Sequence, residues 1–507
     1  MNKLKDISLA CASRLRFCLL MFLLLAAIFF VSCSSETEQK DGGSNTDFKK
    51  FRLVHEIKSD PKSPFHINFN DYPCHRESLP IGVFDSGTGG LTVLNAILEM
   101  DEFDNHTHEK GSDGIPDFIS EKFIYLGDRA NMPYGRYSRE GKTDFLQELI
   151  IKDVQFLLSD RYFISPKDKK PLGRKSPVKA VVIACNTATA YGFELIQQVI
   201  REWDLGIKTI GIIEAGAKEA VPSADLKTRG VIGVFATEGT CDSGGYIRAL
   251  RNYCPECNNQ KIAVVQQPCF GLAGAVDGDQ AYVVGDLTEV RGPEYYQGPR
   301  IGHQKYPIDL SLWEKYNFEQ GSSLLVNTDK EGNITEVELN SIENYIKYYV
   351  TNLAEKALKE EEESLYSVIL GCTHYALFKQ EFKNHFLYLR SIDKKYKELI
   401  PEDLKIIDPA KAEAMSLYMH LREKNLFGQN ENQESQFFLS FPNPYLETNQ
   451  INSRGEFPID YKYGRFINQS FLYVKRIPLT QEMLSKELIL KLKNNLPYLH
   501  KILSNLD

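Results

Sequence analysis

The stretch IGVFDSGTGGLTVL, residues 81–94, decides the fold. Residues 81–84 form an apolar run that predicts a buried strand, DSGTGG predicts a tight turn, and the following residues have helical spacing. A related stretch, IGVFATEGT, recurs at residues 232–240. Further strand–turn–helix patterns alternate from about residue 79 onward, which predicts an α/β protein with mainly parallel sheets. The turn lacks the Lys-Ser/Thr pair of a P-loop, so we favour a tight connection over a phosphate site.

One cysteine follows an apolar run behind each copy of this pattern. Cys185 lies in VVIACNTATA, residues 181–190, and Cys372 lies in VILGCTHYAL, residues 368–377. Polar side chains at the carboxyl ends of parallel strands mark the ligand-binding edge of such sheets. We expect each thiol to lie at a helix N-terminus, where the helix dipole and unpaired N–H groups lower its pKa.

Two such thiols predict a duplicated half-site with the thiols facing each other. Facing thiols suit a two-base proton exchange, in which one thiolate removes a proton from carbon and the opposing thiol returns one to the other face. The weak carbon acid also requires preorganised donors, and the turns DSG, CNT, ATEGT and CTH supply them. The chemistry needs no cofactor and no metal.

The ordered motifs of the chain resemble those of glutamate racemase, in the aspartate/glutamate racemase superfamily. The motifs that carry the resemblance are IGVFDSGTGGLTVL, YLGDRANMPYG, ACNTATA, IGVFATEGT and LGCTHYALF. The resemblance covers residues 79–278 and 366–421, and extends to a strand at 436–441. It implies two pseudo-symmetric α/β domains with mainly parallel sheets, an active site in the cleft between them, an amino-acid substrate and no cofactor.

The resemblance also implies roles for particular residues. Cys185 matches the thiol that serves the face of the D-enantiomer, and Cys372 matches the thiol for the L-enantiomer. Asp85 corresponds to the carboxylate beside the first thiol, and His374 to the helper beside the second. The positions that correspond to substrate contacts are Asp85, Ser86, Pro133, Tyr134, Gly135, Asn186, Thr187, Thr240 and Thr373. By residue type alone, Pro133 and Tyr134 could instead form a turn, and Thr240 could cap a helix.

One segment departs from the family pattern. Where the family has a stretch like CPLLVPLVE, this chain has CFGLAGAVD at 269–277. This segment lacks the prolines of the family, and Asp277 stands where the family has a glutamate. We assign Asp277 to the catalytic residues by this correspondence. A long insertion at 279–345 enters just after Asp277, so we expect it either to form a lid over the site or to block it. A second insertion, 99–120, contains SDGIPD, which is reminiscent of a calcium loop, but we favour a solvated acidic loop.

The N-terminal residues predict export. Lys3, Lys5, Arg14 and Arg16 precede the apolar run 17–32, which is short for a membrane span and ends at Cys33. This arrangement resembles a bacterial lipoprotein signal with Cys33 as the lipidated residue; a plain N-terminal membrane anchor is the alternative. Either reading places the body in the cell envelope, tethered to a membrane.

The predicted domain organisation follows from these patterns. The expected parts are a signal peptide at 1–33, a linker and N-terminal extension at 34–78, racemase-like domain 1 at 79–222, domain 2 at 223–375, a return to domain 1 at 376–441, and a partly helical C-terminal extension at 442–507. The apolar pattern of residues 480–503 predicts an amphipathic helix that either docks on the body or mediates self-association into a homodimer.

Composition and the remaining cysteines limit the classes of partner and metal site that the sequence predicts. The 507 residues are 42% hydrophobic and 25% charged, as in ordinary globular proteins, and the net charge of −8 does not favour nucleic acid as a partner. The lone CPEC at 254–257 lacks a second CxxC for zinc, so a local disulfide or two plain thiols remain open. The function is predicted to be glutamate racemisation. The alternatives are a non-catalytic, membrane-tethered amino-acid-binding protein with this fold, or a racemase for another amino acid such as aspartate.

Overall fold

The computed structural model describes residues 48–507, except 88, 222–229, 255–261, 360–363, 429–433, 448, 454, 470, 485–488, 490–491, 494–495 and 505–507. The described residues all belong to one compact unit, Asp47–Asp507. Cys33 and the apolar run 17–32 lie outside the described residues, as does Cys257. No helix in the described part of the chain is long and apolar enough to cross a bilayer.

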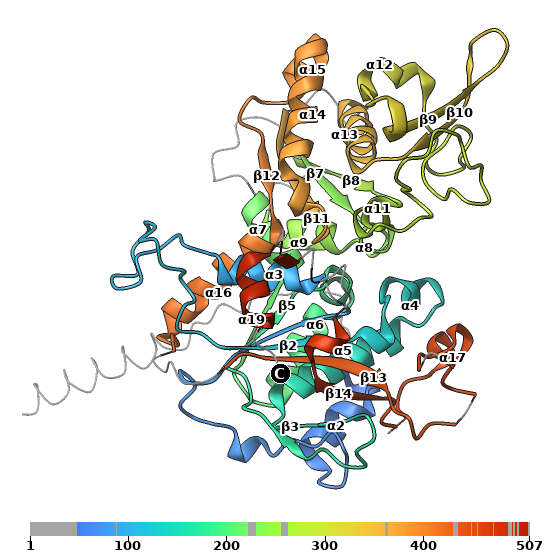
Figure 1. The fold of residues 1–507 in the computed structure, drawn as a ribbon. Coiled ribbons are helices and arrows are strands. Elements are labelled where there is room, and N and C mark those ends of the chain that lie inside the picture. The colour runs from blue at the N-terminus through green and yellow to red at the C-terminus, as the bar shows by residue number, and fades with distance from the viewer. Residues whose placement is uncertain are drawn as a thin grey trace, which may run out of the picture. The chain divides into compact units, whose positions relative to one another are not determined.

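The first sheet has six strands in the order β14-β13-β2-β1-β5-β6 (Figure 1). All neighbouring strands are parallel except β14, which runs antiparallel to β13. The strands are β1 (Ile81–Asp85), β2 (Phe123–Gly127), β5 (Ala180–Ile183), β6 (Lys208–Gly211), β13 (Gln436–Pro442) and β14 (Val474–Pro478). The central strands are continuously apolar because helices cover both faces of the sheet.

The second sheet has four parallel strands in the order β12-β11-β7-β8. These are β7 (Gly230–Ala236), β8 (Ile262–Pro268), β11 (Ser364–Gly371) and β12 (Lys405–Ile407). Both copies of the repeated motif therefore form the strand expected of them, β1 in one sheet and β7 in the other. The predicted α/β class with two mainly parallel sheets is confirmed.

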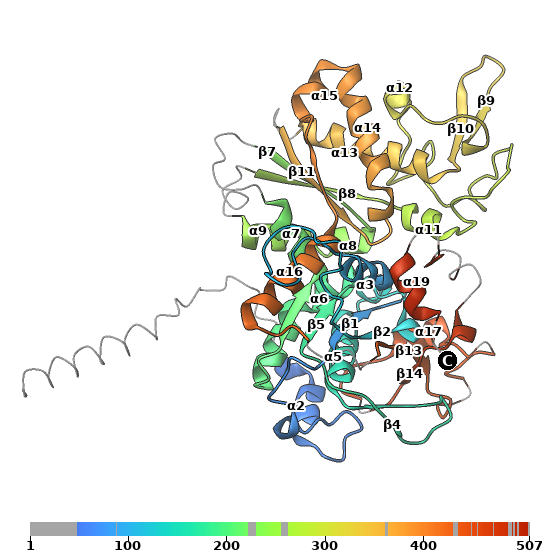
Figure 2. The ribbon, with the colours of Figure 1, turned by 60° about the vertical axis from the view of Figure 1, so that its left-hand side comes forward.

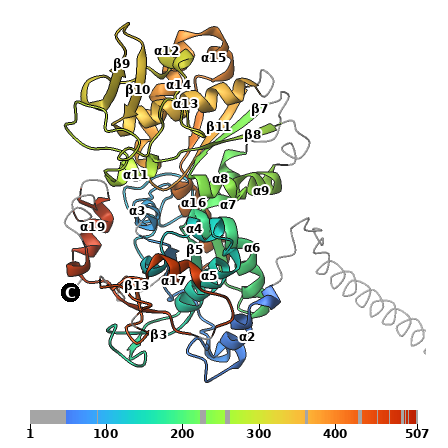
Figure 3. The ribbon, with the colours of Figure 1, turned by 90° about the vertical axis from the view of Figure 1, so that its right-hand side faces the viewer.

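Helices pack on both sheets. Those associated with the first sheet are α2 (Arg52–Ser59), α3 (Gly90–Leu98), α4 (Gly135–Arg139), α5 (Thr143–Leu158), α6 (Asn186–Glu202), α7 (Ile212–Ala220), α16 (Pro409–Lys424), α17 (Ile459–Gly464) and α19 (Pro497–Leu503). Those associated with the second are α8 (Glu238–Asp242), α9 (Gly245–Tyr253), α11 (Leu272–Asp277), α12 (Trp313–Tyr316), α13 (Ile342–Lys359), α14 (Lys379–Ile392) and α15 (Lys394–Leu399). Figure 3 shows α5 and α6 together on one face of the first sheet.

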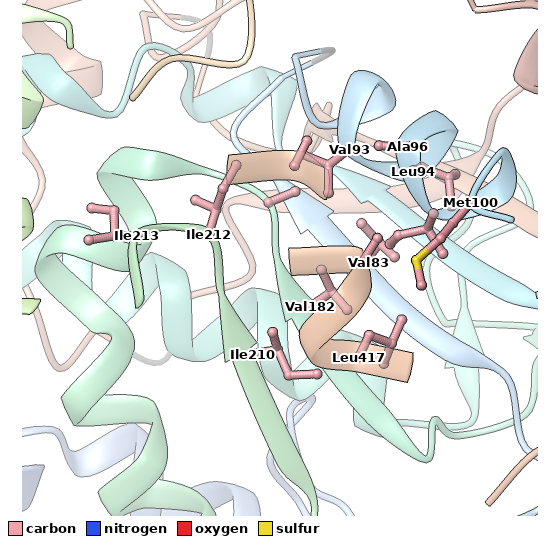
Figure 4. Packing of buried hydrophobic residues seen from close by; sticks show 14 of the residues in the cluster. Val83, Val93, Leu94, Ala96, Met100, Val182, Ile210, Ile212, Ile213 and Leu417 are labelled. Atoms are coloured by element: carbon pink, nitrogen blue, oxygen red, sulfur yellow. The ribbon is translucent and has the colours of Figure 1, made fainter. Parts of the chain in front are cut away.

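One hydrophobic core joins the two sheets. Helices α3, α7 and α16 lie between them in every view (Figures 1 and 2). Val83, Val182 and Ile210 from the first sheet point toward Leu417 of α16 (Figure 4), and the same buried cluster includes Ile369 of β11. Each fully buried side chain of this size contributes about 1.5–3 kcal/mol. This shared core holds the carboxyl edges of the two sheets toward each other.

The return to the first sheet begins later than the sequence predicted. The sequence pattern places residues 376–407 in domain 1, but α14 packs on α13, and β12 pairs with β11 in the second sheet. The chain crosses back only with α16, which contacts α3 and α7. The boundary at 376 was wrong because a helix followed by a short strand has no local feature that identifies its sheet.

The described part of each terminal extension packs on the body. From residue 48 onward the predicted linker packs on the first sheet, with Val54 and Ile57 buried and the Trp203 Nε1 donating to the Val54 carbonyl at 3.1 Å. At the other end, β14 completes the first sheet, and α19 docks on α3, where the Leu499 N–H donates to Asn95 Oδ1 at 3.3 Å (Figure 2). The described part of the predicted amphipathic helix thus docks on the body.

The insertion at 99–120 is an ordered acidic loop. Asp101 accepts hydrogen bonds from Ser112 Oγ at 2.6 Å and from the N–H groups of Asp113 and Gly114 at 3.1 Å each. Asp117 accepts from the N–H of Glu102 at 2.8 Å. These carboxylates hold the backbone of the loop together, which accounts for the SDGIPD sequence without a calcium ion.

A buried ion pair attaches the C-terminal extension to the first domain. Arg476 of β14 places Nη2 2.7 Å from Oδ1 of Asp153 in α5, and both side chains are buried. The Tyr134 hydroxyl oxygen lies 2.6 Å from Oδ2 of both Asp153 and Asp128. Burial and the neighbouring Asp128 carboxylate raise the pKa of Asp153 to about 7. Arg476 therefore supplies the positive charge for a buried acidic cluster.

We expect Arg476→Met to lower the free energy of unfolding by about 1.5–3 kcal/mol, because the charged hydrogen bond to Asp153 is lost and the buried Asp153 carboxyl must protonate. The exposed Arg422→Met is the matched control and should change it by less than about 0.5 kcal/mol. Denaturant titration of both variants measures the difference. Equal losses in the two variants would contradict a structural role for the extension.

Candidate active site

One cavity of about 680 Å³ opens between the carboxyl edges of the two sheets. Its wall includes the residues that follow β1, β5, β7, β8 and β11. The structure brings together on this wall every site residue that the sequence predicted: Asp85, Ser86, Pro133, Tyr134, Gly135, Cys185, Asn186, Thr187, Thr240, Asp277, Cys372, Thr373 and His374. Cys33, predicted to be lipidated, lies outside the described residues. The individual roles of the wall residues stay predictions.

The first half-site is built on the glycine-rich turn after β1. Asp85 Oδ2 accepts from the N–H of Gly87 at 3.1 Å and from that of Gly90 at 3.0 Å, which fixes the carboxylate. A Cβ at Gly90 would lie 2.5 Å from Asp85 Cβ, so only glycine permits this turn. Cys185 Sγ lies 3.5 Å from Ser86 Oγ. The turn therefore presents Asp85 and Ser86 beside the first thiol.

Cys185 lies at the N-terminus of α6, as predicted, but the pKa of its thiol is not lowered. Its side chain accepts from the Ala188 N–H at 3.4 Å, as expected of an N-cap residue. Burial and then the Asp85 carboxylate raise the pKa of the Cys185 thiol to about 12, and the hydrogen bonds from Ser86 and Ala188 offset only part of this. The expectation of a lowered pKa was wrong because it considered the helix dipole without burial and without Asp85.

The second half-site is a chain of three side chains. Cys372 Sγ lies 3.5 Å from His374 Nδ1, and His374 Nε2 lies 3.3 Å from Asp277 Oδ1. Burial disfavours the charged imidazole, but Asp277 and Cys372 outweigh it and raise the pKa of His374 to about 10. The positive charge of the His374 imidazolium therefore lies beside Cys372 Sγ. Asp277 reaches His374 although aspartate is one methylene shorter than the family's glutamate.

Cys372 does not lie at a helix N-terminus, contrary to the prediction. A turn and a short 3₁₀ helix, Ala376–Phe378, separate it from α14, which begins at Lys379. The positive charge near this thiol comes from His374 instead of a helix dipole. The two half-sites are thus built differently, although both follow a copy of the same strand.

Glycines let the two half-sites approach. A Cβ at Gly89 would lie 3.0 Å from Thr373 Oγ1, so the first turn packs directly against the residues after Cys372. A Cβ at Gly371 would lie 2.6 Å from Tyr246 Cε2. The Tyr246 hydroxyl donates to Asn186 Oδ1 at 3.0 Å, so a residue of α9 orients an amide beside Cys185. These contacts explain the glycines without a phosphate.

Two predicted substrate contacts have other partners in the structure. The Tyr134 hydroxyl hydrogen-bonds to Asp128 and Asp153, and the side chain is buried. Any contact of this residue with substrate would therefore be made by its other atoms. Thr237, not Thr240, is the N-cap of α8, and it accepts from the Thr240 N–H at 3.4 Å. Thr240 Oγ1 lies 3.1 Å from Thr237 Oγ1.

The cavity wall also includes residues that the sequence did not single out. Arg139 of α4 and Glu238 of α8 both line the cavity and form an ion pair at 3.3 Å. Phe270 and Tyr282 line the second side, and Tyr282 belongs to the insertion at 279–345. The position of this insertion directly after Asp277 was the available signal. The insertion contributes to the wall and does not fill the cavity. The expectation that it could block the site is therefore wrong.

Cys74, Cys185, Cys241, Cys269 and Cys372 form no disulfide. Within the described ranges, no group of three or more His, Cys, Asp or Glu side chains is placed to hold a metal ion.

Comparison with known proteins points to a single family. No family model matches the chain. A glutamate racemase of Lactobacillus johnsonii is 31% identical over 236 residues, which is 46% of this chain and 70% of the relative. A glutamate racemase of Geobacter metallireducens is 34% identical over 189 residues, 37% of this chain and 52% of the relative. The chain thus spans between about half and seven tenths of the length of these relatives. The crystal structure of a glutamate racemase isoform from Bacillus anthracis aligns with 72% of this chain and 89% of its own, at 24% identity and a TM-score of 0.42.

The two thiols should differ in reactivity. At pH 7.5 iodoacetamide should alkylate Cys372, beside an imidazolium, faster than Cys185, whose thiol stays protonated. Because the pKa of Cys185 is raised to about 12, its alkylation rate should rise about tenfold per pH unit from pH 8 to 10. Peptide mass mapping over time measures both rates.

His374→Ala should remove the advantage of Cys372 and leave Cys185 unchanged, with the exposed Cys74 as the reference thiol for the reagent. Faster alkylation of Cys185 in the unmutated protein would contradict the assigned asymmetry.

Proposed function

The chain belongs to the glutamate racemase family, and from that membership we propose that it interconverts L- and D-glutamate by a two-base proton transfer at Cα, without a cofactor. Family membership makes it an amino-acid racemase by class, an isomerase; the substrate and the mechanism are the proposal. The observation that carries it is the pair Cys185 and Cys372, which line one cavity from the carboxyl edges of two different sheets.

The proton inventory of the step balances with the two thiols alone. The Cys372 thiolate takes the Cα proton of the L-enantiomer, and the electron pair of the broken C–H bond stays on Cα. The Cys185 thiol delivers its proton to the opposite face, which forms the D-enantiomer and a Cys185 thiolate. The unliganded charge state supports this direction, since Cys185 is protonated and an imidazolium faces Cys372. The reverse reaction starts from the product state of the two thiols.

Other wall residues support the transfer. Asp277 holds His374 so that Nδ1 faces Cys372 Sγ, which keeps the charge beside the second thiol. The resemblance assigns substrate contacts to Asn186, Thr187 and Thr373, whose donors would stabilise negative charge that develops on the α-carboxylate. Asp85, fixed by two backbone N–H groups, is available to the substrate ammonium. A bound cation there would also lower the pKa of Cys185.

The direct test is hydrogen exchange at Cα. The purified full-length protein in detergent is incubated in deuterated buffer with a panel of L- and D-amino acids, and NMR follows the loss of the Cα proton. We expect exchange and racemisation with both enantiomers of glutamate. Exchange with aspartate alone would assign the other acidic substrate. Tight binding of an amino acid with no exchange would replace this proposal with the non-catalytic binding protein.

The thiols should be separable by mutation. Cys185→Ser and Cys372→Ser should each lower racemisation at least about hundredfold, since a serine hydroxyl is a far weaker acid than a thiol. Elimination from a glutamate analogue with a leaving group at Cβ needs only one base. It should survive with the L-analogue in Cys185→Ser and with the D-analogue in Cys372→Ser. Cys74→Ser, at an exposed thiol outside the cavity, is the control. Equal loss on both analogues in both variants would contradict one thiol per face.

We further propose that the protein is an exported lipoprotein anchored at Cys33. Four basic residues, an apolar run of moderate length and a cysteine directly after it support this. One further feature of the sequence accords with it: the polar stretch 34–47 separates Cys33 from the first described residues.

Metabolic labelling with a fatty acid tests the anchor. The label should be lost and an unprocessed precursor should accumulate in Cys33→Ala, because the lipidated cysteine is also the cleavage position. Cys18→Ala, within the same segment, is the matched control and should keep the label. Persistent label in Cys33→Ala would rule out the lipoprotein and favour the plain membrane anchor.

A further inference from the structure

The ring of Tyr282 occupies the space beside two glycines of the cavity wall. A Cβ at Gly274 would lie 2.5 Å from Tyr282 Cδ2 and Cε2, and a Cβ at Gly271 would lie 2.6 Å from Cδ1. Side-chain carbons do not approach this closely, so the ring can lie here only because both residues lack a Cβ. All three residues line the cavity. The insertion and the segment before it are therefore complementary in shape.

The segment that carries Tyr282 is held on both sides. Arg291 donates from Nη1 to the Gln280 carbonyl at 2.6 Å and from Nη2 to the Tyr282 carbonyl at 3.3 Å, and its Nε lies 3.0 Å from the buried Glu338. Asn340 accepts from the Val284 N–H at 2.8 Å and donates to the Val284 carbonyl at 2.7 Å. These bonds fix the backbone before and after the ring, so the wall is preorganised.

The ring flanks the second half-site. Gly274 and Asp277 are three residues apart on α11 and therefore share a face. Asp277 contacts His374, which contacts Cys372. On its other side Tyr282 meets Phe270 edge to face, with ring centroids 6.0 Å apart, and Phe270 also lines the cavity. Tyr282 thus bounds the cavity on the side of α11, which carries Asp277 of the second half-site.

We propose that Tyr282 is a specificity-determining residue, whose ring limits the cavity to short acidic amino acids and excludes longer homologues. The inference rests on the proposed function for its substrate, but the ring, its two glycines and its supports are independent of catalysis. One methylene of a substrate packed against a hydrophobic wall changes discrimination by about 10–200-fold. Removal of the ring should therefore open the site to 2-aminoadipate, which is one methylene longer than glutamate.

The first experiment compares 2-aminoadipate and glutamate as substrates by their kcat/KM values. The ratio of the 2-aminoadipate value to the glutamate value should rise at least about tenfold in Tyr282→Ala and stay unchanged in Tyr282→Phe, which keeps the ring. Tyr295→Ala is the control, because Tyr295 is exposed, belongs to the same insertion and does not line the cavity. Melting temperatures show that the variants fold. An unchanged ratio in folded Tyr282→Ala would overturn the proposal.

The second experiment tests the fit between ring and glycine. Gly274→Ala should push the ring into the cavity and raise the KM for glutamate on the order of tenfold. In the Tyr282→Ala background the same methyl group has no ring to displace, so its effect should vanish. An equal effect of Gly274→Ala in both backgrounds would contradict the proposed contact.

Calorimetry separates this inference from the proposed function. The affinities of the same variants for glutamate and 2-aminoadipate should change in the same ratio as kcat/KM. If the unmutated protein binds glutamate but does not racemise it, the proposed function fails, while the affinity ratio still decides the role of Tyr282. If racemisation proceeds and neither ratio changes in Tyr282→Ala, only the inference about Tyr282 fails.

Discussion

The close approach of the glycine-rich turn after β1 to the residues after β11 is the contact on which the site depends. Gly89 faces Thr373, and Gly90 lets Asp85 fold back onto its own turn. A side chain at Gly90 would displace the Asp85 carboxylate, and one at Gly89 would crowd the Thr373 hydroxyl. The shared core of α3, α7 and α16 maintains this approach, because it buries apolar side chains from both sheets in one cluster. The contact between the two turns and the packing of this core together hold the carboxyl ends of β1 and β11 near each other.

Within that cavity the two thiols experience different electrostatics. Cys185 is buried beside a carboxylate, and both features favour its neutral thiol. Cys372 is buried to a similar extent, but a histidine held by Asp277 places a positive charge beside it. The two thiols therefore have different electrostatic surroundings before any substrate binds, although the two strands are copies of one pattern.

The C-terminal extension and the insertion at 279–345 both pack into the two-sheet body. The C-terminal extension contributes β14 and the buried Arg476, which neutralises the acidic cluster around Tyr134 behind one wall of the cavity. The insertion at 279–345 contributes Tyr282 to the opposite wall, where small residues at 271 and 274 leave room for the ring. Segment 269–277 and the insertion after it therefore fit together, because the Tyr282 ring fills the space that Gly271 and Gly274 leave.

The sequence alone determined the fold class and which of its motifs line the cavity. Apolar runs that end in DSGTGG, CNT and CTH specify parallel strands with polar carboxyl ends, since strand burial and turn chemistry are local properties of the chain. Tertiary structure alone decided the charge state of Cys185, the use of the Tyr134 hydroxyl by two aspartates, the sheet to which β12 belongs, and the place of Tyr282. Each of these depends on which distant groups surround a side chain. Desolvation and electrostatic interaction depend on which groups lie close together in space. The spacing of residues along the chain does not reveal which distant groups these are.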